Sequence, residues 1–209
     1  MGMGKLIAVV GNAGVGKTTF TRAFCERFHF VALLEQHAER PFQDKFSSDL
    51  RNYALANQID YLLFRAEQEI QVRRGSAVGV EDGGLDQDYY IFTRLFHKKG
   101  FLTDPEYRLC ERLYSSLRQL LPVPDLMIRL NAPRQVILER RTVRTRELDI
   151  ATSDDVTAIE ALLEGWMAVN PAPVVAVDAS RDDPAFAAAL AALEGQLQPF
   201  LSDRGTMGS

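Results

Sequence analysis

The chain has 209 residues, of which 46% are hydrophobic and 25% are charged, and its formal net charge is −4. This length suits one α/β domain, which we expect at residues 1–202, followed by a disordered tail at residues 203–209. The acidic balance excludes binding of a nucleic acid polymer through a generally basic surface. No stretch approaches the roughly 18 apolar residues of a membrane-spanning helix, so we expect no membrane partner.

The two cysteines of the chain, Cys25 and Cys110, lie within helical patterns. A reduced intracellular protein is the simplest interpretation of so few cysteines. The first residues lack a charged segment followed by an apolar one, so we expect no signal peptide and a cytoplasmic location.

Strand and helix patterns alternate along the chain. In order, they predict a strand at 5–10, a helix at 16–28, a strand at 30–34, a helix at 47–74, a strand at 77–80, a chain break at 81–84, helices at 88–98 and 104–121, a strand at 126–130, a helix from 133 through 141 or slightly beyond, a helix at 153–169 with Ser153 as its N-cap, a strand at 173–177 and a closing helix at 183–201. This alternation is typical of an α/β fold with a parallel sheet and helices on both faces.

A phosphate-binding loop separates the first strand from the first helix. Its glycines allow several backbone N–H groups to point at one anion, and the start of the helix adds a positive dipole end. We expect Lys17 to reach the β- and γ-phosphates of ATP and the hydroxyl of Thr18 to hold Mg²⁺. The alternative is a chance glycine-rich turn. The predicted nucleotide-binding residues are Gly11, Asn12, Ala13, Gly14, Val15, Gly16, Lys17, Thr18 and Thr19.

Two polar residues stand out in the largely apolar helix at 47–74. Gln58 and Arg65 are seven residues apart and therefore lie on one face of the helix. Buried polar side chains need hydrogen-bond partners, and the edge of a nucleobase could supply them. The alternatives are a solvated helix edge or an internal salt bridge between Arg65 and Asp88.

A carboxylate and a group of arginines have the chemistry that phosphoryl transfer needs. Glu35 ends an apolar strand, and ligands of open α/β sheets bind outside the carboxyl ends of the strands, so Glu35 could accept a proton from an attacking hydroxyl. The alternative is a solvated strand end or a helix cap. Arg140, Arg144 and Arg146 could stabilise the transferring phosphoryl group, or they could form a solvated basic helix end.

These features and others occur in the order that the deoxyribonucleoside kinase family shows, and over about residues 5–170 the chain resembles that family. The motifs are the P-loop, Leu33-Leu34-Glu35, Arg40-Pro41-Phe42, the run from Asn52 to Gln58, Arg65, the run from Glu81 to Phe92, and Arg140-x-x-x-Arg144-x-Arg146.

The resemblance implies a three-layer P-loop kinase fold with a five-stranded parallel sheet, ATP as phosphoryl donor, Mg²⁺, a nucleoside 5′-hydroxyl as acceptor, and a homodimer. By position, Glu35 is implied as the general base and Asp82 as a carboxylate near the metal and the acceptor hydroxyl. The substrate side is implied to include Tyr53, and Gln58, Arg65 and Asp88 are implied to read the nucleobase. A lid at residues 139–152 is implied to carry Arg140, Arg144 and Arg146 over the phosphates.

Two positions depart from the family pattern. Asp82-Gly83-Gly84 stands where the family usually has Glu-Arg-Ser, and Ser47 stands where it often has a tyrosine that touches the sugar. The alternatives are therefore a kinase for another small molecule, such as a non-nucleoside alcohol or a nucleoside monophosphate, or a nucleotide-binding structural or regulatory protein without turnover.

Overall fold

The computed structural model describes residues 3–35, 40–143, 154–181 and 183–201, and a parallel sheet forms its centre. The sheet has five strands in the order β2-β3-β1-β4-β5, and every neighbouring pair is parallel. The strands are β1 (Lys5–Gly11), β2 (Val31–Leu33), β3 (Val78–Asp82), β4 (Leu126–Asn131) and β5 (Val174–Asp178). The predicted five-stranded α/β fold is confirmed.

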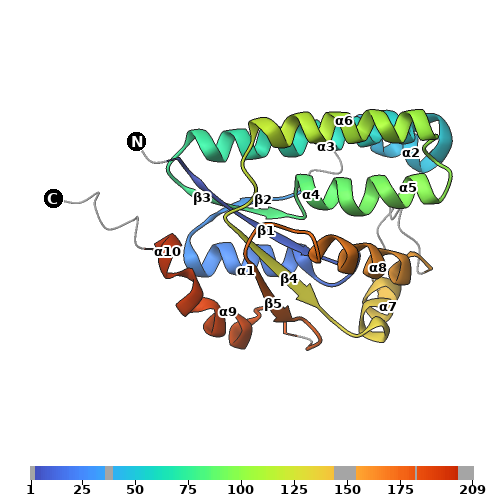
Figure 1. Ribbon diagram of the computed structural model, residues 1–209. Coiled ribbons are helices and arrows are strands. Elements are labelled where there is room, and N and C mark those ends of the chain that lie inside the picture. Colours follow the sequence, from blue (N-terminus) through green and yellow to red (C-terminus); the bar gives the residue numbers. More distant parts are fainter. Residues whose placement is uncertain (1–2, 36–39, 144–153, 182, 202–209) are drawn as a thin grey trace.

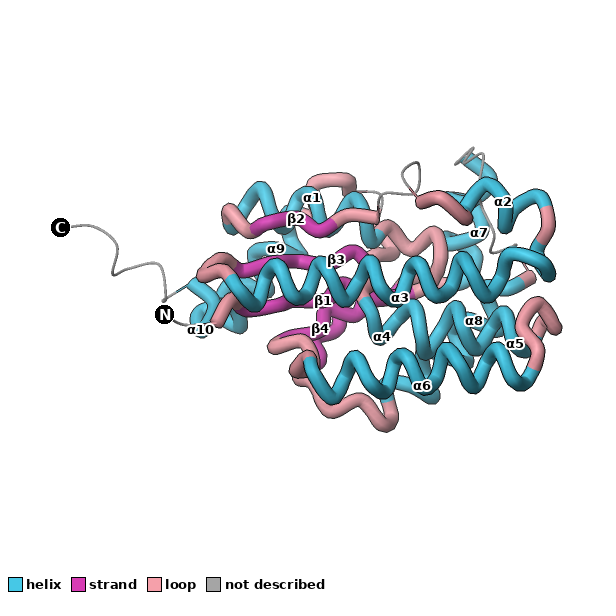
Figure 2. Tube along the Cα trace, turned by 90° about the horizontal axis from the view of Figure 1, so that it is seen from above, coloured by secondary structure: helices cyan, strands magenta, loops and turns pink. Residues whose placement is uncertain are grey.

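Helices cover both faces of this sheet, as Figure 1 shows. One face carries α1 (Lys17–Phe28), α9 (Ala187–Leu193), the 3₁₀ helix at Glu194–Leu197 and α10 (Gln198–Leu201). The other face carries α2 (Gln43–Ser48), α3 (Leu50–Arg74), α4 (Leu85–Gln87), α5 (Arg94–Lys98), α6 (Asp104–Leu120) and α8 (Asp155–Met167). In the view from above, α3 and α6 run side by side, in about the same direction as β1 and β3 (Figure 2). Helix α7 (Arg134–Val143) follows β4.

The alternation of side chains along β1 explains the two layers. Ile7 and Val9 are fully buried on the face of α1, where they belong to the same cluster as Phe24. Ala8 and Val10 point to the opposite face, towards α3 and α8. Because consecutive strand residues face opposite sides of a sheet, one short apolar strand supplies two cores.

Two of the predicted helices are interrupted in the structure. The prediction of a single helix at 47–74 is wrong, because α2 ends before Asp49 and α3 begins after it. The side chain of Asp49 caps α3 by accepting a hydrogen bond from the N–H of Asn52. The closing helix expected at 183–201 is also wrong as one unit. Phe186, with φ 48°, precedes α9, and a 3₁₀ segment then separates α9 from α10.

The chain around the end of β3 also differs from expectation. The strand continues through Asp82, so the break begins at Gly83 rather than at residue 81. The helix expected at 88–98 begins earlier, with α4 at Leu85, and residues Asp88–Thr93 form a π-helix before α5. Helix α8 begins at Asp155, and the predicted N-cap Ser153 lies outside the described residues.

None of the helices in the described part of the chain is both long and apolar enough to span a bilayer.

Candidate active site

The phosphate loop lies between the carboxyl end of β1 and the start of α1. Gly16, with φ 107°, precedes the first residue of the helix, Lys17. The Nζ atom of Lys17 donates to the carbonyl oxygens of Gly11 and Asn12, both at 3.1 Å. The ammonium group therefore lies across the loop, at the amino end of the helix, where an anion would be favoured.

Beside the loop, a hydroxyl and a carboxylate come into contact. Thr18 Oγ1 donates to Asp82 Oδ2, and Asp82 is 2% exposed. Burial and then the negative charge of Glu35 raise the pKa of Asp82, whereas Lys17, the Thr18 hydroxyl and Arg65 act to lower it. A hydroxyl oxygen and a carboxylate suit Mg²⁺, which prefers a few hard oxygen ligands and retains waters.

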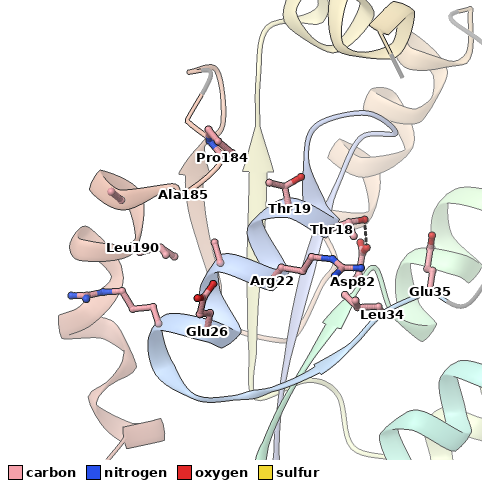
Figure 3. A pocket seen from close by; sticks show the side chains of 13 residues that line it. Thr18, Thr19, Arg22, Glu26, Leu34, Glu35, Asp82, Pro184, Ala185 and Leu190 are labelled. Carbon is pink, nitrogen blue, oxygen red and sulfur yellow. Dashed lines mark hydrogen bonds between the residues drawn. The ribbon is translucent and has the colours of Figure 1, made fainter. Parts of the chain in front are cut away.

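A cavity of about 1160 Å³ opens along the outer side of α1 and is bordered by Thr18, Asp82 and Glu35. Figure 3 shows these three side chains at one end of the cavity, and the side chain of Arg22 extends from α1 toward them. The carboxylates come from the ends of neighbouring strands β2 and β3, which is the edge of the sheet where parallel α/β folds bind ligands.

Arg65 lies at the centre of a group of ion pairs behind this edge. Its side chain is 0% exposed, with Nε 2.9 Å from Asp88 Oδ2 and Nη2 2.9 Å from Glu35 Oε1. Nη2 also donates to the carbonyl oxygen of Asp82 at 2.8 Å, and Nη1 donates to Gln68 Oε1 at 3.1 Å. Burial would lower the pKa of Arg65, but the charges of Asp88 and Glu35 more than offset it, so that this pKa is raised.

The internal Arg65–Asp88 salt bridge, one of the alternatives drawn from the sequence, is therefore confirmed. Gln58 is 2% exposed, and its Nε2 donates to the carbonyl oxygen of Asp88 at 3.1 Å. The same carbonyl accepts from Thr93 Oγ1 at 3.1 Å, within the π-helix. The structure thus brings Gln58, Arg65, Asp88, Glu35 and Asp82 together, and their roles towards a substrate stay predictions.

Other predicted residues lie around this group. Tyr53 is half-buried on α3, against the apolar cluster beneath that helix. Ser47 is exposed, and its hydroxyl donates to the carbonyl oxygen of Asp44 within α2. Arg140 reaches the phosphate loop, because its Nη1 donates to the carbonyl oxygen of Val15 at 3.1 Å and to that of Ala179 at 2.7 Å. Arg144 and Arg146 lie outside the described residues.

Several residues of the site were missed in the sequence, including Arg22, which lines the cavity. Gln87 Oε1 accepts from the N–H of Gly11 at 3.0 Å and so fixes the start of the phosphate loop. Gln68 bridges Arg65 and the end of β2. Tyr61 is buried on α3, and burial and the charges of Glu35 and Asp88 raise the pKa of its phenol. The available signal was helical spacing, since Tyr61 and Gln68 lie four residues before and three after Arg65.

Known proteins resemble this chain in sequence and in fold. The family model described as "Deoxynucleoside kinase" matches residues 7–191. A deoxyadenosine/deoxycytidine kinase from Bacillus subtilis (strain 168) is 28% identical over 174 residues, which cover 81% of this chain and 80% of that protein. A probable thymidylate kinase from Metallosphaera sedula is 30% identical over 147 residues, covering 69% of each.

A solved structure of a deoxyadenosine kinase from M. mycoides, with the product dCMP and a flexible dCDP bound, has a TM-score of 0.78 to this chain. The alignment covers 93% of this chain and 99% of that one, at 20% identity. At 20% identity, the likeness to this solved structure supports the fold alone. The family assignment rests on the match of the family model to the sequence.

Proposed function

Since the chain belongs to the deoxynucleoside kinase family, we propose that it transfers the γ-phosphoryl group of ATP to the 5′-hydroxyl of a deoxynucleoside. The observation that carries this proposal is the convergence of Thr18, Asp82 and Glu35 at one end of a cavity beside the phosphate loop, with the charge of Lys17 acting on Asp82. A phosphate clamp, oxygen ligands for a metal and a proton acceptor are the groups that phosphoryl transfer to an alcohol requires.

On the donor side, the loop at residues 11–19 binds the phosphates through its backbone N–H groups. Lys17 would leave its carbonyl contacts in the loop to neutralise the β- and γ-phosphates. Thr18 and Asp82 would hold Mg²⁺, which supplies charge neutralisation at the phosphate oxygens. Arg140 lies beside the loop and would act there together with Arg144 and Arg146 of the expected lid at 139–152.

On the acceptor side, Glu35 would take the proton from the 5′-hydroxyl to its carboxylate as that oxygen attacks the γ-phosphorus and ADP leaves. The carboxylate is 17% exposed and borders the cavity, so that an acceptor can reach it. Gln58 and Tyr53, both on α3, would contact the base and sugar. Arg65 and Asp88 complete the group of substrate-side residues.

A second candidate is phosphorylation of a nucleoside monophosphate, which the 30% identity to a probable thymidylate kinase favours. Such an acceptor needs a cation beside it, and Arg22 lines the cavity next to Glu35. However, a phosphate acceptor oxygen is already ionised and needs no general base. The carboxylate of Glu35 at the cavity edge therefore favours the alcohol acceptor.

The deciding experiment is a coupled assay of ADP formation with each of the four deoxynucleosides, with dTMP and dCMP, and without an acceptor. We expect at least one deoxynucleoside to raise ADP formation well above the rate without acceptor. Turnover with a monophosphate alone would support the second candidate. Nucleotide binding without acceptor-dependent turnover would leave a binding protein on a kinase fold.

We also propose a cytoplasmic homodimer. Supporting observations are the two buried free cysteines, Cys25 and Cys110, and the exposed leucines Leu63, Leu109 and Leu120 on the neighbouring helices α3 and α6. Light scattering coupled to size-exclusion chromatography should give twice the mass of one chain, and a monomer mass would contradict the dimer.

A further inference from the structure

The guanidinium group of Arg65 lies over a glycine at the end of β3. A Cβ atom built on Gly83 would lie 3.4 Å from Arg65 Nη2 and 3.9 Å from Glu35 Oε1. A longer side chain at position 83 would enter the space in which Arg65 and Glu35 meet. The bare glycine therefore leaves room for an arginine from α3 to reach the carboxylate at the end of β2.

This arginine is already committed to protein acceptors. Its side chain makes four hydrogen bonds, to Asp88, Gln68, Glu35 and the carbonyl of Asp82, out of five available donors. If Arg65 turned away to contact a base, Asp88 and Glu35 would lose their buried partner. Breaking a buried ion pair by removing one partner is strongly unfavourable, because it leaves an uncompensated charge.

Gln68 strengthens the attachment of α3 to β2. Its Oε1 accepts from Arg65 Nη1, and its Nε2 donates to the carbonyl oxygen of Leu34 at 3.2 Å. Leu34 directly precedes Glu35, so α3 holds this end of β2 by its backbone and by the carboxylate side chain. The bonds of Arg65 to Gln68 and to Glu35 both leave from one planar guanidinium, a fixed fork that lysine cannot reproduce.

We propose that Arg65 is a positioning residue for Glu35: it fixes the carboxylate at the edge of the cavity, and nucleobase discrimination belongs to other residues. This inference rests on the proposed function, because it assigns Arg65 to the proton acceptor of that reaction. It also revises the expectation from the sequence that Arg65 reads the base.

Among the described residues, charged and titratable groups around Glu35 come from α3, β3 and α1. Arg65 and Tyr61 face it from α3, Asp82 from β3, and Arg22 lines the same cavity from α1. Of these, Arg65 is the cation in direct contact, at 2.9 Å. A carboxylate that loses an adjacent cation binds its proton more tightly, so the acid limb of the kcat profile should move to higher pH.

The test compares Arg65→Lys with Arg73→Lys. Arg73 is a matched control: it lies on the same helix, is also buried, and donates to Asp125 and to the carbonyl oxygens of Gly4 and Val123. We expect Arg65→Lys to lower kcat about 10-fold or more, to leave KM nearly unchanged, and to preserve the ranking of the four deoxynucleosides. The acid limb of its kcat profile should also move to higher pH, towards that of Arg65→Met. The methionine variant removes the cation altogether, and a shift of about one pH unit is expected for it. Arg73→Lys should lower only the unfolding temperature.

A second arm places Arg65→Lys in a Glu35→Gln background. If Arg65 acts through Glu35, the added substitution should lower kcat by less than twofold. A changed ranking of the four bases with kcat retained would overturn the proposal, as would a full further loss of kcat in the Glu35→Gln background.

Failure of the proposed function would be recognised separately, because wild type would then turn over no acceptor. In that case the contact between Arg65 and Glu35 is tested by the unfolding temperatures of Arg65→Lys, Glu35→Gln and the double variant. Non-additive losses would support a direct Arg65–Glu35 dependence, and additive losses would overturn it.

Discussion

Asp82 and Glu81 are neighbouring carboxylates at the end of β3, yet their surroundings are opposite. Asp82 faces α1, accepts the hydroxyl of Thr18 and borders the cavity. Glu81 is 0% exposed and faces α3 and α6, and neither of its carboxylate oxygens has a hydrogen-bond partner among the described residues. Burial and then the charge of Glu69 raise the pKa of Glu81 well above its ordinary value.

The difference follows from the period of a strand, which sends adjacent residues to opposite faces. On the face of Asp82, a lysine, a hydroxyl and the cavity can serve a charged carboxylate. On the face of Glu81, the nearby Arg118 is already paired with Glu69 and Asp86, and burial raises the pKa of Glu81, which favours its neutral form. Substitutions on the first face should therefore change turnover, and those on the second should change stability.

The largest expected effect is on the cavity face, for Lys17→Ala. This substitution removes the charged donor expected at the phosphates, so kcat/KM for ATP should fall by about 10³-fold, the upper range for one catalytic hydrogen-bond donor. The unfolding temperature should stay close to that of wild type, because Lys17 is only partly buried. Lys98→Ala, at an exposed lysine of α5, is the control. Unchanged ATP affinity by calorimetry would remove Lys17 from the donor site.

Glu35→Gln should have the next largest effect. The amide keeps an oxygen for Arg65 Nη2 but cannot accept the hydroxyl proton, so kcat should fall by about 10²-fold or more while ATP binding is retained. The control is Glu26→Gln: Glu26 lines the same cavity further along α1, and this substitution should leave kcat unchanged. An undiminished kcat in the Glu35 variant would make Glu35 a structural residue.

Features that depend on neighbouring residues in the chain could be predicted from the sequence, whereas contacts between distant residues at the cavity could not. The phosphate loop is specified by eight consecutive residues between a strand and a helix, so its position and that of Lys17 and Thr18 follow from local chemistry. The capping residue Asp49 also carries a local signal, which the continuous helical pattern of 47–74 obscured. Arg65 is different, because a choice among Asp88, Glu35 and a nucleobase depends on the space that Gly83 leaves.

The burial of Glu81 could not be anticipated for a related reason. In the sequence, Glu81 and Asp82 read as one acidic turn after a strand that ends at residue 80. In the structure, β3 continues through both residues. Because they are consecutive strand residues, Asp82 lies beside the phosphate loop and Glu81 is buried under α3 and α6. Strand ends are set by pairing with neighbouring strands, here β1 and β2, and no local residue pattern records that pairing.

The third effect concerns the side of β3 on which Glu81 is buried, and the turn at Gly84 that follows the strand. Gly84 has φ 98°, and a Cβ atom there would collide with Glu81 Oε2. Gly84→Ala should therefore lower the free energy of unfolding by about 2 kcal/mol, through backbone strain and displacement of the buried acid. Gly165→Ala is the control, because that glycine lies in α8 with open space around it and should be neutral or stabilising. Chemical denaturation of both variants measures the difference, and equal stability of Gly84→Ala and wild type would contradict the predicted collision.

The smallest effect is the pH dependence that Glu81 itself contributes. Its folded-state pKa is raised above the ordinary value of 4.5, so the stability linked to its proton is fully present below that pH and is lost as the pH rises towards the folded-state pKa. Each pH unit in this interval should lower the free energy of unfolding by about 1.4 kcal/mol. Glu81→Gln has no proton to release, so it should gain stability on wild type as the pH rises from 4.5 towards the folded-state pKa of Glu81, by at most about 1.4 kcal/mol per pH unit. The variant Glu67→Gln, at an exposed position of α3, should follow wild type throughout. Glu69, Asp86, Arg118 and Arg65 also act on Glu81, so the difference between the two curves reports the proton of Glu81 together with its effect on these neighbours. Parallel curves for wild type and Glu81→Gln over this range would mean that Glu81 is ionised in the folded protein, and the contrast with Asp82 would then lose its electrostatic basis.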